Sequence, residues 1–151
     1  MKDKIITNKI LKWYDINKRS LPWRKKVSNR KKQYYTLVSE FMLQQTQVST
    51  VIPYFQKFIK DIPDLETLAN FNDQKLVKLW EGLGYYSRVR NLKKTAQVVV
   101  KDFNKNIPSN FQKLKSLPGI GDYTASAISA IAFNKPFIPL DGNIERVLKR
   151  Y

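Results

Sequence analysis

Apolar residues recur along this chain at spacings of three and four, and no segment alternates apolar and polar residues for long enough to indicate a strand. Residues that favour turns divide the apolar runs into short segments. Spacings of three and four place apolar side chains on one face of a helix, and such faces are buried by packing against one another. The pattern therefore predicts an all-α fold.

The first half of the chain contains three segments with this spacing. Residues 5–14 carry the first apolar stripe, and its helix should end near Lys18, ahead of a rigid Leu-Pro-Trp sequence. A polar loop is expected over residues 25–32. The most apolar helix should then occupy residues 34 to about 47, and another should follow over residues 48–60.

Capping residues mark the helices of the second half. Asp64 and Asn72 stand at N-cap positions before two short helices, and Gly82 and Gly84 can take the left-handed conformation that ends the second of them. A long helix with a basic outer face is expected over residues 85–103.

Three more helices are expected near the end of the chain. The Pro-Ser-Asn sequence at 108–110 should cap one of them, which runs into the turn sequence LPGIG at 117–121. Asp122 or Tyr123 should open a helix of small residues, whose short side chains allow another helix to approach closely. The last helix should begin near Gly142.

Composition adds a strong positive field to this picture. The chain has 28 Lys and Arg against 12 Asp and Glu, and its formal net charge is +16. Such a field favours a polyanionic partner, although lysine-rich chains also arise without one. The absence of Cys and His excludes disulfides and thiol nucleophiles and argues against a metal site. No secretion signal or membrane-spanning run is evident, so we expect a cytoplasmic protein without a membrane partner.

The LPGIG turn is the first candidate binding site. Gly119 and Gly121 lack side chains and leave backbone N–H groups open at the start of a helix, where the helix dipole also favours an anion. A phosphate of duplex DNA could bind there without any reading of base sequence. An ordinary connection between two helices has the same local pattern.

Two acidic residues are candidates for chemistry. Glu40 lies among apolar residues, a setting that raises the pKa of a carboxyl group, whereas Asp141 opens a helix, where the dipole favours its anion. Each has a structural alternative. Glu40 could belong to an ion pair, and Asp141 could serve only as an N-cap.

The LPGIG turn followed by the LDGN sequence at 140–143 resembles the signature of the helix-hairpin-helix DNA glycosylases. Three further segments resemble the adenine-removing branch of that superfamily, the MutY family. They are LPWR at 21–24, SEFMLQQTQV at 39–48 and LWEGLGYYSR at 79–88.

The resemblance implies a helical barrel and assigns roles to the acidic residues. Glu40 would protonate the adenine ring and then handle the attacking water, while Asp141 would stabilise the cationic sugar. Tyr123 and Asn143 match positions that hold Asp141 and the sugar in place. Tyr123 also stands where endonuclease III-like relatives carry a lysine nucleophile, which argues for base removal without strand cleavage.

A paired adenine must be extruded from the duplex before it can be attacked. The resemblance assigns Gln45 and Tyr85 as wedges that fill the gap. Leu43, Gln44 and Arg88 are expected on the same DNA-binding surface. The residues that match the pocket around the extruded base are Arg19, Trp23 and Arg24, although an Arg here could equally hold a phosphate.

The resemblance also sets the expected organisation. Residues 1–20 should form an N-terminal helix, residues 21–140 a six-helix barrel with its hairpin at about 111–132, and residues 141–151 the start of the next helix. The family continues through further helices, four cysteines that hold an iron–sulfur (4Fe-4S) cluster and a C-terminal domain that recognises 8-oxoguanine. We therefore expect a C-terminally truncated chain without a cofactor of its own. Its first helix should expose an apolar stripe formed by Ile6, Ile10 and Trp13.

These features predict a monomeric, monofunctional DNA repair glycosylase that removes adenine paired with 8-oxoguanine or guanine in double-stranded DNA. Two alternatives remain: a bifunctional glycosylase and lyase of the endonuclease III type, and a helix-hairpin-helix fragment that binds DNA without catalysis.

Overall fold

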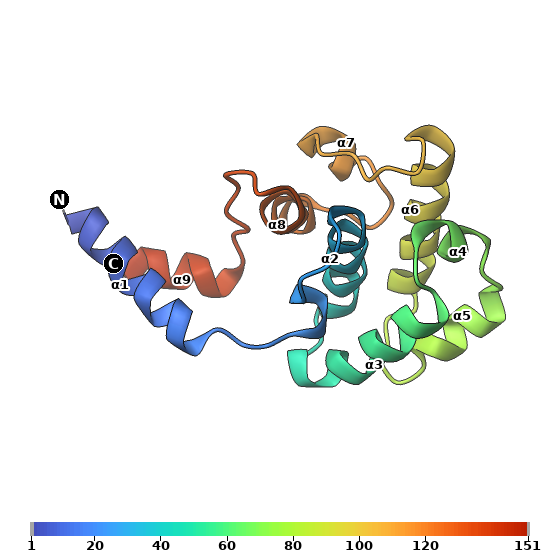
Figure 1. Cartoon of the computed structure of the whole chain (residues 1–151), viewed down its shortest axis with the longest axis horizontal. Coiled ribbons are helices and arrows are strands. Elements are labelled where there is room, and N and C mark those ends of the chain that lie inside the picture. Colours follow the sequence, from blue (N-terminus) through green and yellow to red (C-terminus); the bar gives the residue numbers. More distant parts are fainter. Residues whose placement is uncertain (1, 151) are drawn as a thin grey trace.

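The computed structural model describes the backbone of residues 2–150 and the side chains of residues 4–150. Within that range the chain is helical, with no strand, as the apolar spacing predicts (Figure 1). The elements in chain order are α1 (Lys2–Asn17), the 3-10 helix η1 (Pro22–Arg24), α2 (Asn29–Leu43), α3 (Val48–Asp61), α4 (Leu65–Asn70), α5 (Asp73–Trp80), α6 (Ser87–Asp102), α7 (Phe111–Lys115), α8 (Asp122–Phe133) and α9 (Gly142–Arg150).

Helix α2 is the centre of the packed part of the molecule. It contacts α8 on one side, α6 on the other, and also α3 and η1 (Figure 1). Its residues Leu37, Val38, Phe41 and Met42 are fully buried, because apolar neighbours surround the helix on several sides. The side chains on the inner faces of α2 are therefore positioned by the core.

Local capping explains where several helices begin. Asp64 accepts a hydrogen bond from the Thr67 backbone N–H at 2.8 Å, and Asn72 accepts one from the Lys75 N–H at 3.0 Å. Asn110 caps α7 in the same way. These three caps confirm the expected helix starts, because an N-cap bond depends only on residues within one turn.

Two expected boundaries around α2 are wrong. The polar loop over residues 25–32 is shorter, because Ser28 caps a helix that starts at Asn29. The helix also stops at Leu43 rather than near residue 47, since Gln45 takes a left-handed φ of 58°. Similarly, Tyr85 has φ 47°, so α6 begins only at Ser87.

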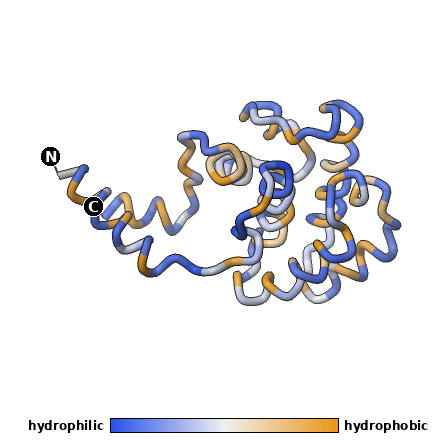
Figure 2. The backbone as a smooth tube through the Cα atoms, viewed as in Figure 1, coloured by the Kyte–Doolittle hydropathy of each residue, from blue (hydrophilic) through white to orange (hydrophobic). Residues whose placement is uncertain are grey.

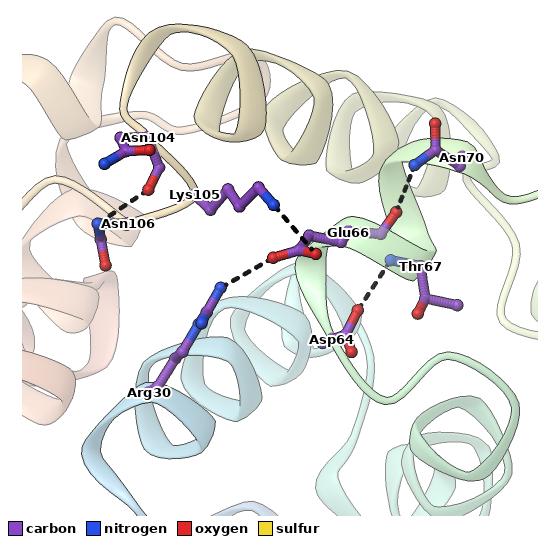
Figure 3. A network of polar contacts seen from close by, with 8 residues as sticks. All are labelled: Arg30, Asp64, Glu66, Thr67, Asn70, Asn104, Lys105 and Asn106. Carbon is purple, nitrogen blue, oxygen red and sulfur yellow. Dashed lines mark hydrogen bonds and ion pairs between the residues drawn. The ribbon is translucent and has the colours of Figure 1, made fainter.

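The basic residues at the start of α2 partly serve the fold. The Arg30 guanidinium donates to the Glu66 carboxylate at 3.0 Å, and the Lys105 ammonium lies 3.4 Å from the same carboxylate (Figure 3). This network ties α2, α4 and the turn after α6 together. Because its members are exposed, it adds little free energy of folding.

Helices α1 and α9 lie apart from the helices gathered around α2 (Figure 1). The expected apolar stripe on α1 is confirmed for Ile10 and Trp13, which are 59% and 63% exposed, while Ile6 is only half-buried. Hydrophobic and hydrophilic positions alternate along this isolated helix (Figure 2). Helix α9 has no buried residue. The molecule thus combines a packed region with a loosely held end.

Candidate active site

Glu40 lies on the last turns of α2 and is half-buried. Burial raises the pKa of its carboxyl group from 4.5 to about 7, and the positive charge of Arg24 opposes that shift. Among residues 4–150 no basic nitrogen lies within 4.0 Å of the carboxylate, so the alternative of a structural ion pair is not supported. A carboxyl group with a pKa near 7 can donate a proton at neutral pH.

Asp141 stands immediately before α9. Its Oδ1 accepts hydrogen bonds from the backbone N–H groups of Asn143 at 3.0 Å and Ile144 at 2.8 Å. The expected N-cap is therefore present, and it fixes the direction of the carboxylate. Both bonds use Oδ1, so the cap does not occupy Oδ2.

Tyr123, on the first turn of α8, links the two acidic residues. Burial raises the pKa of its phenol, and the negative charges of Glu40 and then Asp141 raise it further. Both carboxyl groups therefore act on one side chain, which is 44% exposed. Tyr123 on α8 is thus close enough to feel the charge of Glu40 on α2 and of Asp141 just before α9.

Asn143 contributes to the site in a way that differs from the expectation. Its backbone N–H binds Asp141, but its side-chain Oδ1 accepts a hydrogen bond from the Arg146 guanidinium at 2.8 Å. The expected hold on Asp141 thus comes from the backbone of Asn143 rather than from its amide side chain.

The expected base-pocket residues do surround Glu40. Arg19, Trp23 and Arg24 line a cavity of about 70 Å³ with it, and Leu43 closes another wall. The Trp23 side chain is 6% exposed and packs edge-on against Phe55, with ring centroids 5.3 Å apart. Pockets that hold small molecules measure roughly 300–1,000 Å³, so this cavity must widen to admit a base.

Ile131 also lines this cavity, and sequence reasoning missed it. The signal was available, because Ile131 lies eight residues after Tyr123 and so falls on the same face of α8. A search for apolar partners of Tyr123 at helical spacing would have found it.

The two hairpin glycines play different parts. Gly119 has φ 76°, and a Cβ atom there would lie 2.8 Å from Asn91 Cβ and 2.9 Å from Phe41 Cε1. Gly119 is thus required by close packing on α2 and α6. Gly121 has nothing within 4 Å of such an atom and leaves the start of α8 without a side-chain cap, so the N–H groups there remain open to an anion.

Side chains from neighbouring elements hold the hairpin in place. Thr95 donates to the Pro118 carbonyl at 2.8 Å. The Gln44 amide lies 3.4 Å from the Gly119 carbonyl and 3.3 Å from the Thr124 hydroxyl. Gln44, which was expected on the DNA-binding surface, joins the end of α2 to the hairpin.

The two expected wedges lie on turns. Gln45 is exposed on the turn between α2 and α3, and Tyr85 is 65% exposed on the turn between α5 and α6. Both have positive φ, which is uncommon for residues other than glycine and often marks functional turns. Tyr86, in contrast, packs against the core. The structure thus separates two adjacent tyrosines that the sequence alone cannot distinguish.

The expected contact of Arg88 with DNA is wrong. Its side chain is 6% exposed, and its guanidinium donates to the backbone carbonyls of Met42 at 2.8 Å and Leu83 at 2.9 Å, among others. A guanidinium whose two terminal nitrogens bind interior acceptors, and whose Nε is buried without a partner, is not available to a phosphate. The sequence motif predicts an arginine at this position, but it does not predict whether the side chain points to solvent or to the interior.

The residues present do not fit an iron–sulfur cluster. Such a cluster is held by cysteine thiolates, and the chain contains no Cys. Within the described residues there is also no group of three or more acidic, His or Cys side chains that could hold a metal ion. Across the same residues, no helix has the length and apolar content needed to cross a membrane.

The chain is similar to proteins that are named adenine DNA glycosylase. The chain is 48% identical over 143 residues to an adenine DNA glycosylase of Buchnera aphidicola subsp. Baizongia pistaciae, covering 94% of this chain and 40% of that protein. It is 44% identical over 146 residues to the adenine DNA glycosylase of Homo sapiens, covering 93% and 27%. The chain therefore spans less than half the length of these relatives.

Solved structures and a family profile complete the comparison. A thermostable thymine-DNA glycosylase superimposes with a TM-score of 0.86 at 28% identity, covering 98% of this chain and 67% of that one. An endonuclease III in a non-covalent DNA complex superimposes with a TM-score of 0.79 at 20% identity, covering 97% and 67%, which shows a shared fold. The profile of the HhH-GPD superfamily matches residues 38–151, most of the chain. The chain therefore belongs to the HhH-GPD superfamily of base excision DNA repair proteins.

Proposed function

We propose that this chain carries the catalytic residues of a monofunctional adenine DNA glycosylase, which hydrolyses the N-glycosidic bond of adenine paired with 8-oxoguanine or guanine. One observation carries the proposal: Glu40, with a pKa of about 7, and the oriented Asp141 both act on Tyr123. Two carboxyl groups in different environments are what acid-assisted cleavage of a glycosidic bond needs. The relatives named adenine DNA glycosylase support adenine as the base.

The proposed reaction begins with the protonated form of Glu40, which donates its proton to a ring nitrogen of adenine. The bond between the base and the sugar then breaks, and its electron pair leaves with the base. The carboxylate of Asp141 stabilises the positive charge that develops on the sugar. A water molecule adds to the sugar carbon and gives its proton to Glu40, which restores the starting state.

Tyr123 supports hydrolysis without strand cleavage. Strand cleavage through a Schiff base needs an amine near the sugar, and a phenol cannot supply one. Lys115 lies before the LPGIG turn, and its ammonium nitrogen is 2.8 Å from a carboxylate oxygen of Asp122. Trapping with borohydride should therefore leave no covalent complex between this protein and DNA.

Double-stranded DNA is the proposed partner, held by the hairpin and by the strong positive charge of the chain. Because one chain supplies Glu40, Tyr123 and Asp141, a monomer suffices. The proposed place of action is DNA in the cytoplasm.

The decisive experiment is a single-turnover assay on duplexes that contain adenine opposite 8-oxoguanine, guanine or thymine, with alkali used to reveal abasic sites. Folded Glu40→Gln and Asp141→Asn proteins serve as matched variants. We expect release of adenine from the first two duplexes and its loss in both variants. Salt-sensitive binding without base release by the folded wild-type chain would contradict the proposal and support a DNA-binding module.

A further inference from the structure

Arg88 occupies an unusual position for a charged side chain. It is 6% exposed on α6, and burial of a guanidinium carries a large desolvation cost unless its N–H groups are satisfied. An apolar side chain would fill the same space without that cost. The contacts of Arg88 show what the guanidinium supplies instead.

The two terminal nitrogens of Arg88 bind two different turns. Nη1 donates to the carbonyls of Met42 at 2.8 Å and Gln44 at 2.6 Å and to the Thr46 hydroxyl at 3.1 Å, all at the junction of α2 and α3. Nη2 donates to the carbonyls of Leu83 at 2.9 Å and Gly84 at 3.0 Å, on the turn between α5 and α6.

These are the turns that present Gln45 and Tyr85. Each residue is exposed and has a left-handed backbone, with φ 58° and 47°. The guanidinium of Arg88 also lies 5.7 Å from the centre of the Tyr85 ring and 5.5 Å from that of Trp80. The face of Tyr85 is therefore held by the same group that joins the two turns.

We propose that Arg88 is a positioning residue that fixes the spacing of the Gln45 and Tyr85 turns, so that both side chains enter the duplex together when the adenine is extruded. This inference rests on the proposed function and adds a residue that does not itself touch DNA. Two wedges can act on one base step only if their turns keep a constant separation. A lysine cannot replace Arg88, because a single ammonium cannot reach both sets of carbonyls as the planar fork does.

The test measures extrusion directly, with the fluorescence of 2-aminopurine placed opposite 8-oxoguanine in a duplex saturated with protein. We expect Arg88→Lys to lower the extrusion equilibrium about tenfold, as the loss of charged hydrogen bonds predicts. Thr46→Val, which removes one partner of Nη1, should cause a smaller loss. Arg90→Lys, an exposed neighbour on α6, is the matched control and should behave as wild type.

A double-mutant cycle separates positioning from simple destabilisation. If Arg88 acts through Tyr85, Arg88→Lys should have little further effect in a Tyr85→Ala background. Val99→Ala changes a buried position on the same helix. It shows whether a fall in melting temperature equal to that of Arg88→Lys is enough by itself to reduce extrusion. Additive effects, or an equal loss in Val99→Ala, would overturn the role of Arg88. Wild-type protein that binds the duplex without any rise in fluorescence would overturn the proposed function as well.

Discussion

The two carboxyl groups of the site are held by contrasting parts of the molecule. Glu40 lies on α2, which is surrounded by α3, α6, α8 and η1, whereas Asp141 opens α9, a helix with no buried residue. Core packing sets the chemistry of the first, because burial is the main cause of its raised pKa. Local backbone hydrogen bonds orient the second. The proposed reaction thus depends on two kinds of structural support.

The largest expected effect tests whether packing around Glu40 sets its chemistry. Replacement by Gln should slow adenine excision by about 10²–10⁴-fold, the range for loss of a general acid. In the wild-type protein, the single-turnover rate should fall about tenfold for each pH unit above about 7, because the protonated fraction of Glu40 declines.

Arg24→Met sharpens this prediction. The positive charge of Arg24 lowers the pKa of Glu40, so its removal should move the inflexion of the pH profile to higher pH. An inflexion near the ordinary value of 4.5 would show that the core does not tune this group.

The next effect is a pH dependence of folding stability. Because the pKa of Glu40 is higher in the folded chain than its ordinary 4.5, the folded state binds the proton more tightly. The stabilisation is complete below pH 4.5 and is lost as the pH rises through about 7. Urea unfolding should show a decline of at most about 3 kcal/mol from this group, and Glu40→Gln should remove it. A decline of the same size in the variant would mean that another group is responsible.

A third prediction compares the two glycines of the hairpin. Gly119→Ala forces a Cβ atom into Phe41 and Asn91 at a positive φ and should reduce the free energy of unfolding by about 1–3 kcal/mol. Gly121→Ala meets nothing and should leave the melting temperature unchanged. Equal melting temperatures for the two variants would show that the hairpin does not pack tightly on α2.

A smaller effect is expected where the support is local. Asp141→Ala removes the cap of α9 and should cost about 1 kcal/mol in helix stability, whereas Asp141→Asn retains a capping side chain. Circular dichroism of both variants, with the excision assay alongside, would separate capping from chemistry. Loss of the α2 core in either variant would contradict a purely local role.

The smallest effect should come from α1. Trp13 is 63% exposed, so Trp13→Ser should change the free energy of unfolding by no more than about 0.5 kcal/mol. Phe41→Ala, in the packed region, should cost about 3–5 kcal/mol. Denaturant midpoints of the two variants measure the contrast, and a large effect of Trp13→Ser would show that α1 is part of the core.

Much of the fold was predictable because it depends on short-range contacts. Asp64, Asn72 and Asn110 cap helices where expected, since each bond joins residues three apart. The end of α2 was misplaced because Gln45 takes a left-handed conformation that sequence patterns do not predict for this residue type.

The candidate site also combines features that sequence patterns predict with features that they do not. The family resemblance predicted Glu40, Tyr123 and Asp141 as site residues, and in the structure the charges of both acidic residues raise the pKa of Tyr123. Arg88 was misassigned, because an arginine near the exposed Tyr85 can point to solvent or to the interior. Its contacts with Met42 and Gln44 join segments more than forty residues apart.

The sequence by itself determined the helical class and the helix caps, because these depend on residue type and near neighbours, and its resemblance to a known family predicted the acidic pair. Only the tertiary structure decided that Glu40 has a pKa of about 7, that Gly119 must be a glycine and that Arg88 joins two turns. Burial and close approach arise from atoms that distant segments contribute, and local patterns carry no record of those atoms.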